Sequence, residues 1–412
     1  MTPPARKDDP VQSQYEQWVY PEPVPDLSDP RARKVRDGGD PDVLGSAYWP
    51  DRPPRRGLHI LVAGCGPNAA ARYAFNHPDA KVTGVDLSES SLAHARYLKE
   101  KHQLANLALH QCRVEDVEKL GSSFDLIDST GVLHHLPEPE RGIHALAKVL
   151  RPDGAMFLML YATYGRTGVY MLQRLFRLLG LGQSPADIMF AKQALAALKT
   201  DHAGRKYIDS AADLHFDAGI VDTFLHPQDR AYTVADCIEF LERAGLVLQG
   251  WLDNYLYYPE WQMARDHPLF ERINSLPEPQ CWQAMELFHG RIPTHSFFAC
   301  HRTRDPASYR LDFGRQDFMA MAPKRRFGLV CFTGTDGTVA LERTPFPKIT
   351  LRDSHAAIFR QVDDRKTIGE CFRASGVHAA SEEIAASFCR DMFRDLWRLG
   401  YLDLVFPPAL AR

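Results

Sequence analysis

The feature that most constrains this chain is a short apolar run, Ile60 to Ala63, which is followed by two glycines one residue apart, Gly64 and Gly66. Four consecutive apolar residues predict a buried strand, and residues 69–73 are typical of the start of a helix. Glycine has no Cβ, so the intervening turn can be tight and its backbone can approach a ligand closely. The free N–H groups at a helix start favour a polar or anionic ligand group. The segment therefore predicts a strand, a ligand-binding turn and a helix, with a purely structural turn as the alternative.

A second strand, residues 81–85, ends in the carboxylate of Asp86. In a βαβ unit this position allows hydrogen bonds to both hydroxyls of a ribose. The third glycine of the dinucleotide fingerprint is missing, because position 69 is alanine. A pyrophosphate needs that close approach and a nucleoside without phosphates does not, so the pattern favours S-adenosylmethionine over a nicotinamide cofactor.

The same alternation of strands and helices continues along the chain. Strands are expected at 59–63, 81–86, 107–111, 124–128, 155–161, 246–251 and 296–301, and helices at 68–76, 89–101, 139–149 and 233–244. This order predicts an α/β, doubly wound and mostly parallel sheet. Ligands of such sheets bind at the carboxyl ends of the strands, which places Gly64, Asp86, residues 129–134 and Tyr161 around one crevice.

Several motifs together resemble class I S-adenosylmethionine-dependent methyltransferases. They are Val62-Ala-Gly-Cys-Gly-Pro-Asn68, Val85-Asp-Leu-Ser88, Phe124-Asp125, Gly131-Val-Leu-His-His-Leu136 and Leu150-Arg-Pro-Asp-Gly154. The resemblance implies a seven-stranded Rossmann-like sheet and S-adenosyl-L-methionine as the cofactor. Gln14-Tyr-Glu16 and Tyr20-Pro21 are also similar to bacterial tetratricopeptide-linked or protein lysine methyltransferases, although no tetratricopeptide repeat is present.

The resemblance also implies roles for individual residues. The turn at Gly64 would pass under the methionine moiety, Asp86 would hold the ribose, and Leu87 would pack on the adenine. Arg113 stands where an acid commonly reaches the adenine amino group, so the backbone at Val114 and the carboxylate of Glu115 are the alternatives for this contact. The expected cofactor-binding residues are Gly64, Cys65, Gly66, Asp86, Leu87, Val114, Thr130 and Gly131.

Catalysis by such an enzyme requires mainly orientation and desolvation, because a sulfonium is already a strong electrophile. A general base is needed only if the acceptor atom carries a proton. His134 and Tyr161 are the candidate catalytic residues. His134 or His135 could serve as the base, the alternative being that one packs and the other hydrogen-bonds the backbone, and Tyr161 could instead position the acceptor. No metal ligand is expected, because the eight cysteines are scattered without a C-x-x-C pair.

The chain divides into three predicted parts. Residues 1–56 form an N-terminal arm and lead-in, residues 57–304 the methyltransferase domain, and residues 305–412 a small α+β, winged-helix-like accessory domain. Aromatic residues of the arm either staple it to the domain or close over the cofactor. An insertion at about 165–232 is expected to be a helical substrate lid. Its polar candidates, which can equally be caps and turn residues, are Asp217, Asp222, His226 and Asp229.

Composition narrows the function further. The net charge of −3 and the lack of a long basic run argue against nucleic acid as a partner. No apolar run reaches membrane-spanning length, and scattered cysteines without a signal peptide indicate reduced thiols in a cytoplasmic protein. The sequence thus predicts a methyltransferase that acts on a protein side chain or a small molecule. A catalytically silent S-adenosylmethionine-binding regulator and a nicotinamide-dependent oxidoreductase are the alternatives, and the oligomeric state stays open.

Overall fold

The computed structural model describes residues 9–29, 39–52 and 55–406. Parts of the arm and lead-in predicted over residues 1–56 therefore lie outside the described residues. The chain forms two compact units. The first comprises residues 1–39, 56–248 and 290–302, and the second residues 40–55, 249–289 and 303–412.

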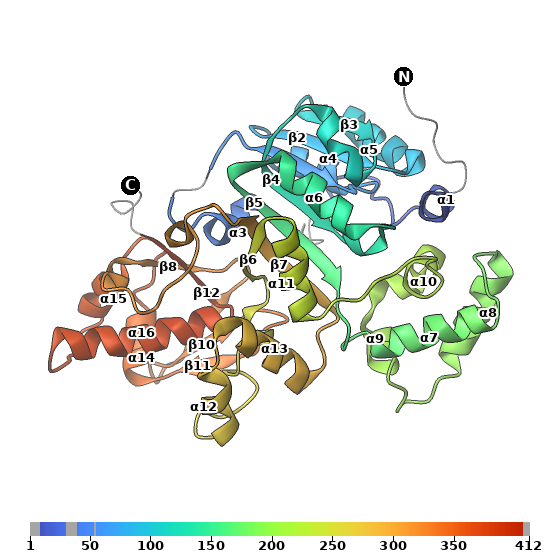
Figure 1. The fold of residues 1–412 in the computed structure, drawn as a ribbon. Coiled ribbons are helices and arrows are strands. Elements are labelled where there is room, and N and C mark those ends of the chain that lie inside the picture. Colours follow the sequence, from blue (N-terminus) through green and yellow to red (C-terminus); the bar gives the residue numbers. More distant parts are fainter. Residues whose placement is uncertain (1–8, 30–38, 53–54, 407–412) are drawn as a thin grey trace. The chain divides into compact units, whose positions relative to one another are not determined.

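A seven-stranded sheet organises the first unit, and its strand order is β3-β2-β1-β4-β5-β7-β6 (Figure 1). Its strands are β1 His59–Ala63, β2 Lys81–Asp86, β3 Leu107–Gln111, β4 Phe124–Thr130, β5 Leu150–Tyr161, β6 Leu246–Trp251 and β7 Thr294–His301. The strands from β3 to β5 pair in parallel, whereas β7 runs antiparallel to β5. This arrangement confirms the predicted doubly wound sheet.

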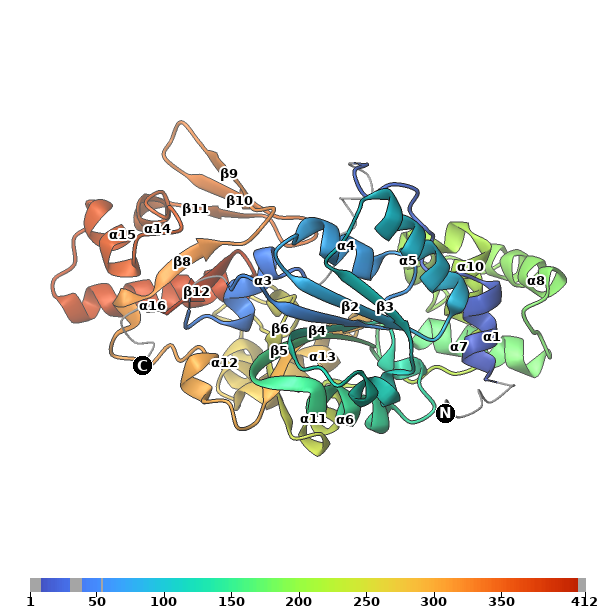
Figure 2. The same cartoon turned by 90° about the horizontal axis from the view of Figure 1, so that it is seen from above.

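Helices cover both faces of this sheet. Helices α4 (Ala69–Asn76) and α5 (Glu89–Lys101) lie on one face, and α6 (Pro139–Val149) and α11 (Val234–Arg243) on the other (Figure 2). Strands β1 and β4 are almost wholly buried, although β4 carries Asp125 and Asp128 among its apolar residues, and such burial is what coverage on both faces requires. One detail differs from the prediction. Residues 150–154, which precede the strand expected at 155–161, are the first part of β5, and the pairing register with β4 shifts between Phe124 and Leu126.

The predicted insertion is helical. It contains α7 Thr167–Leu178, α8 Pro185–Ala196, α9 Arg205–Ser210 and α10 Asp217–Phe224. These helices share a small hydrophobic core of their own, which includes Leu172, Phe176, Ile188 and Phe224. Because this core holds α10 in place, polar side chains on α10 can be presented at a defined position.

The second unit is α+β. It contains the two-stranded sheet of β8 (Ala322–Arg325) and β12 (Leu402–Val405), and a three-stranded sheet in the order β11 (Ile349–Leu351), β10 (Val339–Glu342) and β9 (Val330–Thr333). Its helices are α3 Pro41–Tyr48, α12 Pro268–Asn274, α13 Glu278–His289, α14 Asp353–Phe359, α15 Ile368–Ala374 and α16 Glu382–Arg398. Helix α3 lies in the predicted lead-in, where Asp40 and Pro41 supply an N-cap and a first helical residue. Among the described residues, no helix is both long enough and apolar enough to cross a membrane.

Candidate functional site

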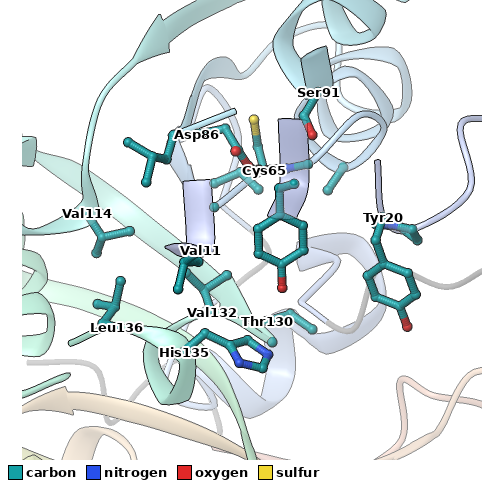
Figure 3. Close-up of a pocket in the computed structure, with 18 of the residues that line it drawn as sticks. Val11, Tyr20, Cys65, Asp86, Ser91, Val114, Thr130, Val132, His135 and Leu136 are labelled. Atoms are coloured by element: carbon teal, nitrogen blue, oxygen red, sulfur yellow. Dashed lines mark hydrogen bonds between the residues drawn. The ribbon is translucent and has the colours of Figure 1, made fainter. Parts of the chain in front are cut away.

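A cavity of about 370 Å³ opens at the carboxyl ends of β1, β2 and β4 (Figure 3). It lies entirely in the first unit, and the N-terminal arm and the helical insertion contribute to its wall. All eight residues expected to bind the cofactor line it: Gly64, Cys65, Gly66, Asp86, Leu87, Val114, Thr130 and Gly131. The fold therefore brings these eight residues together around one cavity.

The turn after β1 needs its first glycine for two reasons. Gly64 has φ +74°, and a Cβ built there would lie 2.4 Å from a methyl carbon of Val132. The N–H groups of Gly64 and Cys65 both donate to the carbonyl of Val85, at 2.8 and 2.9 Å. This pair of hydrogen bonds ties the turn to the end of β2 and holds its backbone against the cavity.

Asp86 stands at the end of β2 with both carboxylate oxygens engaged. Oδ2 accepts a hydrogen bond from the N–H of Gly66 at 2.7 Å, and Oδ1 accepts one from the N–H of Ser88 at 2.9 Å. Burial raises the pKa of Asp86, and the backbone donors oppose this effect. The donors fix the carboxylate in place, and each oxygen keeps acceptor capacity for a ligand hydroxyl.

The segment after β3 supplies one end of the cavity. Val114 begins a 3₁₀ helix, Val114–Leu120, and lines the cavity together with Glu115. Oε2 of Glu115 is buried and has no hydrogen-bond partner within the described part of the chain. Arg113, which stands where an acid was expected, pairs instead with Asp9 of the arm at 2.7 Å.

The opposite end is built around Asp222, on α10. Its Oδ1 accepts a hydrogen bond from the Tyr15 hydroxyl at 2.9 Å, and its Oδ2 accepts one from the Tyr161 hydroxyl at 3.3 Å. All three residues line the cavity. Burial raises the pKa of Asp222, an effect that the nearby His135 opposes. This cluster joins the arm, β5 and the insertion at one carboxylate.

The two residues expected to be catalytic occupy different positions. Tyr161 lines the cavity, whereas His134 has no exposed surface and does not line it. The His134 ring packs against the Tyr161 ring with centroids 3.9 Å apart. The neighbouring His135 does line the cavity, and Figure 3 shows its ring beside Thr130.

The backbone of Gln228 holds two stacked imidazoles in opposite tautomers. Nδ1 of His135 lies 3.0 Å from the carbonyl oxygen of Gln228, so this nitrogen carries the proton and donates. Nδ1 of His226 accepts from the Gln228 N–H at 3.0 Å, so in the neutral ring the proton is on Nε2. Ligand atoms of His135, Asp222 and His226 lie within 4.8 Å of one another, a spacing that could hold a metal ion. In this tautomer, however, His226 Nε2 has no lone pair to offer a metal.

The other polar candidates of the insertion lie elsewhere. Asp217 forms an exposed ion pair with Lys192 at 2.5 Å, and Asp229 accepts from Gln173 at 2.8 Å. Neither lines the cavity. Of the three aspartates and one histidine named from the sequence, Asp222 is the one that lines the cavity. Nothing in the neighbouring sequence distinguishes it from the other three.

The N-terminal arm is fastened to the first unit along its length. The Glu16 carboxylate accepts from the N–H groups of Glu89 and Ser90, at 2.6 and 3.0 Å, which are the first two helical residues of α5. The arm contributes Val11, Tyr15, Tyr20 and Pro21 to the cavity wall. The arm is therefore stapled to the domain, as one interpretation of the sequence expected, and its side chains also form part of the cavity wall.

Comparison with known proteins gives a consistent result. Residues 61–158 match the family model described as "Methyltransferase domain". An uncharacterized protein of Synechococcus sp. is 30% identical over 261 residues, which are 61% of this chain and 62% of that protein. A ubiquinone biosynthesis O-methyltransferase of Neisseria meningitidis is 33% identical over 103 residues, 25% of this chain and 43% of that protein. The chain thus spans less than two thirds of the length of these curated relatives.

Among solved structures, PKMT2 from Rickettsia typhi is similar in fold. The match has a TM-score of 0.65 at 15% identity and covers 89% of this chain and 76% of that one. A second structure of the same protein, in complex with AdoHcy, matches with a TM-score of 0.64 at 15% identity over 75% of its chain. Identity at this level supports the fold alone, and the strand order described above is that of the Rossmann-like methyltransferase fold.

Proposed function

We propose that this chain, which carries a class I methyltransferase domain, is a methyltransferase that uses S-adenosyl-L-methionine. The observation that carries the proposal is the cavity in which the Gly64–Gly66 turn faces the fixed carboxylate of Asp86. A glycine turn without the third glycine, followed by a ribose-binding acid, suits a nucleoside that has no pyrophosphate. The antiparallel β7 also argues against the nicotinamide oxidoreductase alternative.

The residues present fit this cofactor at three points. Asp86 would accept from the ribose hydroxyls, and Leu87 and Val114 would pack on the adenine. The buried, unpartnered Oε2 of Glu115 would accept from the adenine amino group. The bound cofactor supplies an electrophilic methyl group, and the chain's own residues orient the acceptor and exclude water.

The acceptor would bind at the Asp222 end of the cavity. Tyr15 and Tyr161 hold the carboxylate there, so Tyr161 is a positioning residue and His134 supports its ring. The O-methyltransferase relatives make an oxygen acceptor one candidate, but they match mainly the cofactor-binding half. A protein side chain and a small molecule both stay open as acceptors.

Calorimetric titration with S-adenosylmethionine and, separately, with NAD tests the cofactor. We expect S-adenosylmethionine to bind the wild type, and Asp86→Asn to weaken binding about 10- to 100-fold, since hydrogen bonds to a charged group are worth about 1.5–3 kcal/mol. Asp201→Asn is the control, because Asp201 is exposed and lies outside the cavity. Tight binding of NAD in place of S-adenosylmethionine would refute the proposal.

Turnover separates an enzyme from a silent binding protein. Donor with a labelled methyl group is incubated with the protein and with fractions of bacterial protein and small-molecule extracts. Label transferred to an acceptor, and lost in Asp86→Asn, supports the enzyme. Binding without transfer to any fraction favours the regulatory alternative.

A further inference from the structure

Strand β9 (Val330–Thr333) is the outermost strand of the three-stranded sheet in the second unit. It pairs antiparallel with β10 (Val339–Glu342), which in turn pairs with β11 (Ile349–Leu351). Figure 2 shows β9 at the free side of its hairpin. Within the described residues, no strand pairs with the other edge of β9, so its outward N–H and C=O groups are available.

The hydrophobic core beneath this sheet ends at β10. Val339 and Leu341 of β10 are 2% and 0% exposed, but the residues of β9 opposite them, Thr333 and Cys331, are exposed. The other face of β9 is exposed as well, with Val330 at 49% and Phe332 at 53%. Strand β9 therefore lies beyond the edge of the hydrophobic core, and its large apolar side chains are exposed to solvent.

None of the usual protections of an edge strand is present in β9. Natural edges are guarded by lysine, proline, bulges or inward-pointing charges, and the four residues Val-Cys-Phe-Thr contain none of these. Two cations near the strand are paired with acids, because Arg325 pairs with Asp364, and Lys348, whose Nζ lies 6.0 Å from the centroid of the Phe332 ring, pairs with Glu342. A second uncharged edge could therefore approach without like-charge repulsion.

We propose that β9 is a self-association surface, on which two copies of this chain pair through their β9 strands in antiparallel orientation. An antiparallel edge is its own complement under a two-fold axis perpendicular to the sheet, and that operation keeps each side chain on the same face. Side chains alternate between the two faces along a strand, so residues that face each other across the axis must both have odd numbers or both have even numbers. A second copy consequently satisfies the hydrogen bonds of both edges at once.

The side chains select one register. When Cys331 lies opposite Cys331 of the partner subunit, each Val330 lies opposite the partner's Phe332. This register makes two pairs of an aromatic with a β-branched residue, a combination that stabilises cross-strand contacts. It also brings two thiols to opposed positions, where Cβ atoms are about 4.5–5.5 Å apart. The strand is short, so the contact is smaller than a standard interface and the dimer is expected to depend on protein concentration.

Cross-linking of the full-length wild-type chain tests the register directly. Cys331 is the one exposed cysteine among the described residues, and Cys112 is partly buried at the cofactor cavity. A short bismaleimide is therefore expected to give a covalent dimer, joined at Cys331, whose yield rises with protein concentration. Cys331→Ser is expected to abolish it. A monomer in every lane, or a dimer joined elsewhere, would overturn the proposed register.

Sedimentation velocity over a series of protein concentrations tests self-association through β9 without a cross-linking reagent. Val330→Lys introduces a charge at the edge and is expected to shift the midpoint of dimerisation at least tenfold towards higher concentration. Ile384→Lys is the matched control, because Ile384 is a β-branched residue of the same unit with 54% exposure away from this sheet. Circular dichroism verifies that both variants fold. A wild type that stays monomeric, or a dimer that Val330→Lys leaves unchanged, refutes the proposal.

Discussion

At the scale of single residues, Glu115 offers the cavity a hydrogen-bond acceptor that is not used within the described part of the protein. Its buried Oε2 has no partner among the described residues, and a buried polar atom without a hydrogen bond is costly. An amino group of a bound ligand would donate the missing hydrogen bond to this oxygen. The sequence raised Glu115 as an alternative to the usual acid, because Arg113 occupies the expected position, and the ion pair between Arg113 and Asp9 shows where that cation goes instead.

Glu115→Gln tests this contact. The substitution exchanges a charged acceptor for a neutral one, so we expect the affinity for S-adenosylmethionine to fall about tenfold, or ~1.4 kcal/mol. An analogue with unsubstituted purine in place of adenine lacks the amino group and adds no new donor or acceptor, so it should bind wild type and variant about equally, which completes a double-mutant cycle measured by calorimetry. Glu118→Gln, in the same 3₁₀ segment but exposed, is the control. An equal loss for both ligands would contradict the contact.

Asp222 makes a second prediction at this scale, which concerns pH. Because burial raises its pKa in the folded protein, folding takes up a proton there. Its contribution to stability is complete below the pKa of an unfolded aspartate and is lost as the pH rises through the raised pKa. Asp222→Asn removes this titration. The free energy of unfolding of the variant should therefore increase relative to that of the wild type as the pH rises. The gain should be about 1.4 kcal/mol for every pH unit that separates the folded pKa from the unfolded pKa.

Urea unfolding of both proteins over a pH series measures this difference. Asp217→Asn is the control, since Asp217 begins the same helix but is half-exposed in an ion pair. A difference between Asp222→Asn and wild type that stays constant with pH would show that the Asp222 carboxyl does not titrate differently on folding.

At the scale of elements, the N-terminal arm is held by the unpaired end of a helix. The first N–H groups of α5 have no intrahelical partner, and Glu16 accepts from two of them. The Ser90 hydroxyl also donates to this carboxylate at 2.6 Å. Partial burial alone would raise the pKa of Glu16, but these donors hold it below its ordinary value. The arm and α5 are therefore coupled through one side chain.

Glu16→Gln should loosen this coupling. Loss of a helix-capping carboxylate costs about 0.5–2 kcal/mol, and Tyr15 and Val11 of the arm line the cavity. We expect faster proteolysis within residues 9–28 and an affinity for S-adenosylmethionine about three- to tenfold lower. Gln17→Ala, an exposed neighbour on the same arm, serves as the control. Unchanged proteolysis and affinity would mean that the other hydrogen bonds of the arm suffice.

The same elements show what a sequence can and cannot predict. Strand β1 follows from an apolar run, and the Gly64 turn follows from local backbone requirements, so both can be predicted from neighbouring residues. The pairing of Tyr15 with Asp222 joins residues 207 positions apart, and no local pattern encodes it. Both histidines are buried, but only His135 lines the cavity, and this difference depends on how the chain packs around them, which explains why the sequence could not separate the two.

At the scale of the whole molecule, the ligand-binding residues belong to one unit. Every residue that lines the cavity lies in the first unit, which includes the arm and the insertion. The second unit is assembled from three separate stretches of the chain. Its core holds residues such as Leu341, Ile358, Phe393 and Leu402. A ligand that binds only the folded first unit should therefore stabilise the two units unequally.

Hydrogen exchange with and without S-adenosylhomocysteine tests this expectation. At a ligand concentration 100 times the Kd, the bound state gains about 2.7 kcal/mol, so amides of β1, β2 and β4 should exchange up to about 100-fold more slowly. Amides of β9, β10 and β11 should change little, because these strands contain no residue of the cavity. Asp86→Asn at the same ligand concentration is the control and should abolish most of the protection. Equal protection of the strands in both units would show instead that the chain opens as a single cooperative body.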